Sequence, residues 1–197
     1  MLICPSPTVS AFSAVGAWGR HVWAVLTREE VRSRPVYVAY ATAAAVIPAN
    51  LLALLLAAGA TALGYPLEAF SIPATYTWGN LAADVFLVLL FAPIVETGLM
   101  ALFIFIMRAF SARAVWLIGI TALVFGLSHS ILGDTLAKQI GHAVPTMWAF
   151  AVYAGVYLVW SRGEHDATMG YTMATLTHAC YNLVPVGVRL IGSQVVG

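Results

Sequence analysis

Long apolar runs separated by short polar segments dominate the chain. A helix that crosses a bilayer needs about 20 mainly apolar residues, because the hydrocarbon core is about 30 Å thick and each residue rises about 1.5 Å. Five runs meet this requirement, so the pattern predicts an all-α fold, a polytopic transmembrane helix bundle with about five spans. Pro48 and Pro93 are expected to kink their helices. The predicted spans are residues 36–63, 78–107, 114–132, 140–160 and 168–190.

The N-terminal stretch has a different pattern. From Val15 to Val25, apolar residues recur at helical spacing while polar residues fall toward the opposite side. This spacing predicts an amphipathic helix over residues 10–26 that lies in the membrane interface and does not cross the bilayer. The chain is therefore expected to consist of a cytoplasmic and interfacial segment, residues 1–35, and one transmembrane bundle, residues 36–191.

The composition supports a membrane protein and narrows its partners. Hydrophobic residues make up 61% of the 197 residues and charged residues 9%, against roughly 45–50% and 25% in soluble domains. This excludes a soluble globular enzyme, and the lipid bilayer becomes the expected surroundings. A net charge of +1 gives no basic surface, so nucleic acid is not an expected partner. Cys4 and Cys180 are too few for a disulfide framework or a thiolate metal site.

The distribution of Lys and Arg predicts the orientation. Of these nine residues, seven fall on the side of the membrane that holds the N-terminus and two on the other side. The positive-inside rule then places the N-terminus in the cytoplasm and the C-terminus outside, in the inner membrane if the source is prokaryotic. Asp84 and His142 lie near the outer ends of their spans, and we expect them at the outer interface.

A few polar side chains fall deep inside the predicted spans. An ionisable group in the bilayer core costs at least about 2.5–3.5 kcal/mol, so each is a functional candidate. Helical rise places Glu96 about 18 Å, His129 about 24 Å and His178 about 15 Å from the cytoplasmic edge, with Asn182 one turn beyond His178. A lone histidine can simply hydrogen-bond a neighbouring helix. Three helices that bring such groups to one depth instead predict a shared internal site.

Two kinds of hydrolytic chemistry fit these residues. In the first, Glu96 is a general base for a water molecule held by the histidines, and the His178 imidazole and Asn182 amide stabilise the oxyanion. In the second, Glu96, His129 and His178 form a His₂Glu set around zinc. The zinc alternative makes Glu96 a ligand and leaves no obvious second carboxylate as the base. We therefore favour the first, which requires no cofactor.

Three short motifs resemble those of a known family. Residues 92–97 read APIVET, residues 125–129 read FGLSH and residues 178–182 read HACYN. In this order and on separate helices, they resemble the motifs of the CAAX prenyl protease and bacteriocin-processing family (CPBP, or Abi) of intramembrane proteases. Those motifs are a double Glu followed by an Arg, Phe-x-x-x-His, and His-x-x-x-Asn or Asp. The resemblance covers about residues 78–185.

The resemblance implies a role for each matched residue. Glu96 matches the glutamate held to activate water, and His129 matches the histidine that positions this water. His178 and Asn182 match the motif that stabilises the oxyanion. The implied activity is that of a membrane-embedded endopeptidase, a class often named metalloproteases, acting on a membrane-embedded or membrane-delivered peptide.

The first motif departs from the family pattern at two positions. Thr97 stands where the second Glu is expected, and Ala101 stands where the Arg is expected. The missing pair would orient the first glutamate, so a second hypothesis is a catalytically impaired member that serves as an immunity or interaction membrane protein. Haem ligation by His129 and His178 ranks lower because it gives Glu96 no role. Proton or ion conduction also ranks lower, because one deep carboxylate does not make a ladder of sites across the bilayer.

Overall fold

The computed structural model describes residues 24, 27, 33–65, 85–162 and 166–195, and this part of the chain is helical without strands. The all-α bundle predicted from the apolar pattern is thereby confirmed. The predicted interfacial helix, apart from residue 24, and Asp84 lie outside the described residues. The elements are α2 (Arg34–Ala62), the π-helical η2 (Leu87–Phe91), α4 (Ala92–Met107), α5 (Ala114–Ser130), α6 (Leu136–Trp160) and α7 (Ala167–Val195).

The helices agree with the predicted spans within a few residues at the ends that the structure describes. The largest difference at a helix start is in α6, which begins at Leu136 and not at residue 140. Its start is set by Thr135, whose hydroxyl accepts a hydrogen bond from the backbone N–H of Lys138 at 3.3 Å. This contact caps the first turn and adds it to the helix. His142 consequently lies in the second turn of α6.

Three helical segments are long and apolar enough to cross a membrane: Arg34–Ala62, Leu87–Met107 and Leu136–Trp160. The apolar helix α5 is shorter, at 17 residues. The molecule therefore fits an integral membrane protein, while crossing by all five predicted spans stays a prediction. Large apolar side chains also remain exposed on the helices, among them Leu54, Phe105 and Val115. Water-soluble monomers rarely leave such extended apolar surfaces uncovered.

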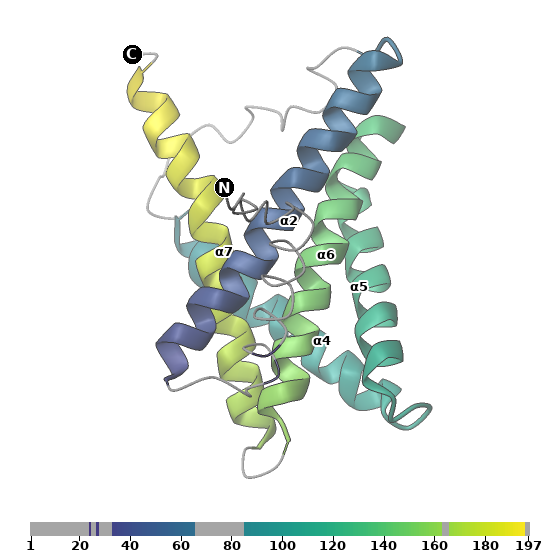
Figure 1. Cartoon of the computed structure of the whole chain (residues 1–197), viewed down its shortest axis with the longest axis vertical. Helices are drawn as coiled ribbons and strands as arrows, with labels where there is room; N and C mark the ends of the chain where they lie inside the picture. Colours follow the sequence, from purple (N-terminus) through teal and green to yellow (C-terminus); the bar gives the residue numbers. More distant parts are fainter. Residues whose placement is uncertain (1–23, 25–26, 28–32, 66–84, 163–165, 196–197) are drawn as a thin grey trace, which may run out of the picture.

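Helix α6 is the central element of the bundle and packs against α2, α5 and α7 (Figure 1). Its most extensive contact is with α5, which runs beside it in Figure 1. Gly126 makes this close approach possible. A Cβ atom at Gly126 would lie 2.9 Å from the carbonyl oxygen of Ala143 and would overlap the Met147 side chain.

A proline in α2 creates a specific connection to α6. Pro48 lies inside the helix and has no N–H, so the carbonyl of Ala44, four residues earlier, loses its usual donor. The indole N–H of Trp148 donates to this carbonyl at 2.8 Å. The proline predicted as a kink point thus lies within a continuous helix, and the carbonyl that it frees holds α6 against α2.

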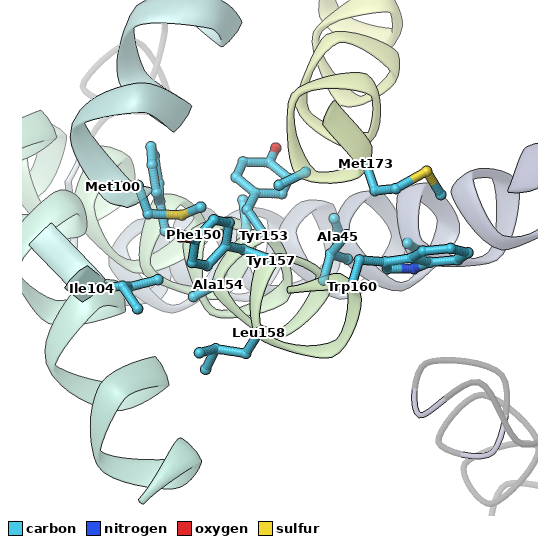
Figure 2. Packing of buried hydrophobic residues seen from close by; sticks show 14 of the residues in the cluster. Ala45, Met100, Ile104, Phe150, Tyr153, Ala154, Tyr157, Leu158, Trp160 and Met173 are labelled. Carbon is cyan, nitrogen blue, oxygen red and sulfur yellow. The ribbon is translucent and has the colours of Figure 1, made fainter. Parts of the chain in front are cut away.

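The buried core lies where α2, α4, α6 and α7 meet (Figure 2). Its large side chains come mainly from α6, including Phe150, Tyr153 and Tyr157, and Met100 packs against them from α4. These side chains fill the centre of the bundle beside the polar residues described next.

Candidate active site

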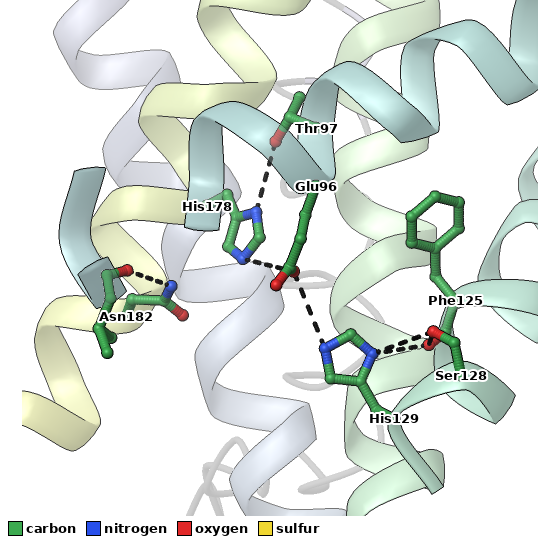
Figure 3. A network of polar contacts seen from close by, with 8 residues as sticks. Glu96, Thr97, Phe125, Ser128, His129, His178 and Asn182 are labelled. Atoms are coloured by element: carbon green, nitrogen blue, oxygen red, sulfur yellow. Dashed lines mark hydrogen bonds and ion pairs between the residues drawn. The ribbon is translucent and has the colours of Figure 1, made fainter. Parts of the chain in front are cut away.

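Glu96 lies between two histidines from different helices (Figure 3). It comes from α4, His129 from the end of α5 and His178 from the middle of α7. The same carboxylate oxygen, Oε2, is 3.8 Å from Nε2 of His129 and 3.7 Å from Nε2 of His178. The structure thus brings together the three ionisable residues that the depth argument grouped.

The cluster of Glu96, His129 and His178 is partly exposed on one side and buried on the other. Side-chain exposure is 31% for Glu96 and 26% for His129, whereas that of His178 is only 6%. The exposed part of the cluster is therefore on Glu96 and His129, while His178 forms its buried side.

The hydrogen bond to Phe125 defines the orientation of His129. The Nδ1 atom of His129 lies 2.8 Å from the carbonyl oxygen of Phe125, in the preceding turn of α5. A carbonyl can only accept, so Nδ1 carries the hydrogen, and in the neutral ring Nε2 is a lone-pair acceptor. This acceptor faces the carboxylate Oε2. A water molecule could donate one hydrogen to each, which is the geometry that general-base activation of water requires.

His178 is held by contacts to two other helices. Its Nδ1 lies 3.4 Å from the hydroxyl of Thr97 on α4, and both side chains are buried. Its ring stacks on Tyr153 of α6, with centroids 4.5 Å apart and planes 22° from parallel. Phe150 packs edge-on against the same ring at 5.7 Å. These contacts fix the plane of the imidazole and direct Nε2 toward Glu96.

Asn182 is near the cluster in sequence but has a different partner. Its side-chain nitrogen donates to the carbonyl of Val88 in η2 at 2.9 Å (Figure 3). The reason lies in the π-helical register, in which the N–H of Ala92 donates to Leu87. The next donor in this register would come from residue 93, and Pro93 has none. The Asn182 amide therefore satisfies a carbonyl that the helix itself leaves unpaired.

The sequence-based reasoning missed the residues of α6 and the contribution of Thr97. It assigned no site residue to the span at 140–160, yet Phe150 and Tyr153 from this helix contact His178. One signal was present: Tyr153 lies about two turns inside the end of α6, whereas tyrosine in a membrane span prefers the interface itself. Thr97 was noted only as a departure from a motif, and its contact with His178 could not be read from spacing.

Within the described part of the chain, no group of three or more His, Cys, Asp or Glu side chains is arranged to hold a metal ion. The other described carboxylates are Asp134, in the connection between α5 and α6, and Asp166, which precedes α7. Asp134 pairs with Lys138 at 2.9 Å, and Asp166 accepts from the N–H of Met169. Neither contact involves the cluster around Glu96. Comparison of the chain with protein-family models, curated proteins and solved structures found no match.

Proposed function

We propose that this protein is an intramembrane endopeptidase in which Glu96 is the general base. The observation that carries the proposal is the position of one carboxylate oxygen 3.7 and 3.8 Å from the Nε2 atoms of two histidines on separate helices. These distances exceed a direct hydrogen bond, which is about 2.7–3.2 Å, and leave room for polar contact through a reacting water.

The first step is attack by water on the scissile carbonyl. Glu96 takes one proton from the water, and His129 Nε2 accepts a hydrogen bond from the other hydrogen. The water oxygen bonds to the carbonyl carbon, and the π electron pair of the carbonyl moves onto its oxygen. His178 supports this oxyanion when the Thr97 hydroxyl donates to Nδ1, because the ring hydrogen is then on Nε2.

The second step releases the products. The oxyanion re-forms the carbonyl, the bond from carbon to nitrogen breaks, and the proton held by Glu96 passes to the leaving nitrogen. The products are a carboxylic acid and an amine, and Glu96 returns to its ionised form. Every proton in these steps is carried by water, by Glu96 or by the substrate.

The motif resemblance supports the same proposal. Glu96, His129 and the pair His178 and Asn182 correspond to the three motifs of the CPBP family, and we propose that the chain is a variant member. In the place that the family gives to a second glutamate, Thr97 provides a hydroxyl that contacts His178. The substrate class is a peptide that is embedded in the membrane or delivered to it.

We also propose that the N-terminus is cytoplasmic and the C-terminus external. The end of α4 contacts the end of α6, where Arg108 donates to the hydroxyl of Ser161 at 3.1 Å. The start of α2 lies at the same end of the bundle, because Tyr37 packs edge-on against Trp160. The Arg side chains near these helix ends, including Arg34, therefore gather at one end, the arrangement expected of a cytoplasmic side.

The test maps new protein termini, so it works with a substrate of any sequence. Wild type and Glu96→Gln are produced at equal levels in a bacterial host, and the N- and C-termini of its membrane proteins are identified by mass spectrometry. We expect a set of cleavage sites in or near membrane spans that appears with wild type and is lost with Glu96→Gln. Identical sets for the two proteins would overturn the proposal.

A matched control separates the role of Glu96 from a general effect of charge. Asp134→Asn removes the exposed carboxylate that pairs with Lys138, at a place remote from the histidines. We expect Asp134→Asn to keep the wild-type cleavage sites. Thermal unfolding of both variants in detergent checks that each one folds.

The second candidate function is a non-catalytic membrane interaction or immunity protein. The observation that favours it is that Thr97 and Ala101 stand where the resembled motif has a second Glu and an Arg. This candidate predicts that a cellular phenotype survives the double variant Glu96→Ala, His178→Ala. Loss of the phenotype in a folded double variant would exclude it.

A further inference from the structure

Tyr153 is a fully buried tyrosine about two turns before the end of α6 (Figure 2). Only 1% of its surface is exposed. Its ring stacks on His178 and meets Phe150 and Tyr181 edge-on, with centroids 5.4 and 6.0 Å away. These neighbours come from two helices and hold the ring in one orientation against His178.

The hydroxyl of Tyr153 is buried without a hydrogen-bond partner in the part of the chain that the structure describes. Leaving such a group unsatisfied lowers stability, and buried polar groups in folded proteins nearly always have partners. A phenylalanine would fill the same space without this cost. The hydroxyl therefore indicates a partner that arrives with a bound molecule.

The Tyr153 hydroxyl differs from the other unpaired buried hydroxyls in the residue that its side chain contacts. Those of Thr42, Thr121 and Thr175 also lack a partner among the described residues. Tyr153 differs because its ring stacks on His178, which lies 3.7 Å from the carboxylate of Glu96. Its unpaired donor therefore belongs to a side chain that contacts the candidate active site, which those of the three threonines are not shown to do.

The other expected donor, the amide of Asn182, already uses one of its two N–H groups. Asn182 gives a hydrogen to the Val88 carbonyl, and Pro93 ensures that this carbonyl has no replacement within its own helix. This bond ties the position of the amide to η2, although its second N–H can still donate. The tyrosine hydroxyl has no such bond among the described residues, so its only hydrogen is available to a bound molecule.

We propose that the Tyr153 hydroxyl donates a hydrogen bond to the oxyanion of the tetrahedral intermediate, in the role that the sequence motifs suggest for Asn182. This inference rests on the proposed peptidase function. No proton is transferred to the oxyanion, since the hydrogen remains on the tyrosine and only stabilises the charge that develops on the former carbonyl oxygen.

The experiment compares Tyr153→Phe with Tyr157→Phe, a matched control one turn further along α6. Tyr157 is also buried, but its ring faces the guanidinium of Arg108 at 5.9 Å. The probe is a quenched fluorogenic peptide built on a cleavage site found by terminus mapping. Wild type, both phenylalanine variants and Glu96→Gln are assayed in liposomes for kcat and KM, and their thermal unfolding is measured.

We expect Tyr153→Phe to lower kcat by about 10²–10³-fold with little change in KM, the loss typical of removing one oxyanion donor. We also expect its unfolding temperature to equal or exceed that of wild type, because an unsatisfied hydroxyl has been removed. Tyr157→Phe should keep wild-type kinetics. Activity then falls without a loss of stability, which a purely structural role would not produce.

The remaining outcomes each have a definite meaning. Wild-type kcat in Tyr153→Phe, together with loss of activity in Glu96→Gln, would overturn the role of Tyr153 and retain the peptidase. A fall in kcat accompanied by a fall in unfolding temperature would assign Tyr153 to packing and overturn the donor role. Equal activity of Glu96→Gln and wild type would overturn the peptidase and the inference with it.

Discussion

The Thr97 hydroxyl lies 3.4 Å from Nδ1 of His178, and both side chains are buried between α4 and α7. This contact ties the helix that carries the carboxylate to the helix that carries the more deeply buried imidazole. It holds the ring so that its other nitrogen faces Glu96. Thr97 therefore has a positioning role in the proposed mechanism, although it differs from the residue that the resembled motif would place there.

We predict that Thr97→Val lowers kcat by about two- to tenfold, because one hydrogen bond contributes about 0.5–1.5 kcal/mol and about 1.4 kcal/mol corresponds to a factor of ten in rate. Valine matches the shape of threonine but cannot contact Nδ1. Thr97→Ser keeps the hydroxyl and should retain most of the rate. The check is kcat and KM on the same fluorogenic peptide, and equal rates for the valine and serine variants would remove the positioning role.

The second prediction concerns Asn182 and the π-helical segment. Asn182→Leu should lower the free energy of unfolding by about 1–3 kcal/mol, because it leaves the Val88 carbonyl without a donor. Pro93→Ala restores an N–H at the position where the π register needs one. In the Pro93→Ala background the same leucine substitution should therefore cost less. Unfolding in detergent gives the four free energies, and additivity of the two substitutions would contradict this explanation.

Much of the fold could be predicted from the sequence, because a long apolar run must be helical in lipid and the helical rise is constant. The same regularity put Glu96, His129 and His178 at one depth, and these side chains lie together in the structure. Which way each helix is rotated depends on packing between helices. No spacing rule indicates that α5 packs closely against Ala143 of α6 at Gly126. This contact nevertheless helps to set the position of His129.

The hydrogen-bond partner of Asn182 is a second feature that could not be predicted from the sequence. Its spacing of four residues from His178 suggested a common role, since residues i and i+4 share a helix face. The structure engages its amide with Val88, because a π-helical turn before Pro93 leaves that carbonyl unpaired. Spacing along one helix reveals neither a π-helical turn nor a partner on another helix, so this contact could not be read from the local sequence.

The third prediction tests the connection between α2 and α6. Trp148→Phe should destabilise the protein by about 1–3 kcal/mol, because the Ala44 carbonyl loses the indole donor and Pro48 cannot replace it. Pro48→Ala supplies a backbone N–H to Ala44. Trp148→Phe should therefore cost less in the Pro48→Ala background. An equal cost in the two backgrounds, measured by unfolding in detergent, would show that packing of the indole and not its hydrogen bond is the stabilising contact.

The fourth prediction concerns the packing of α5 on α6. Gly126→Ala places a methyl group 2.9 Å from the Ala143 carbonyl oxygen, so the two helices must separate. Forced overpacking of this kind costs about 1–3 kcal/mol. Because His129 lies on the same helix, kcat should fall as well. Gly119→Ala is the matched control on α5, since a Cβ there meets no atom within 4 Å. Equal unfolding temperatures for the two alanine variants would contradict the steric explanation.

The last prediction separates the two hydrolytic mechanisms that the sequence left open. Zinc bound by Glu96, His129 and His178 would use the carboxylate as a ligand, and the other described carboxylates, Asp134 and Asp166, have partners elsewhere. The general-base mechanism instead leaves Glu96 free to accept a proton. We therefore expect the purified protein to keep its rate of peptide cleavage after dialysis against 1,10-phenanthroline and EDTA. Loss of the rate, with recovery on adding zinc but not magnesium, would assign these three side chains to a metal centre and exclude Glu96 as the base.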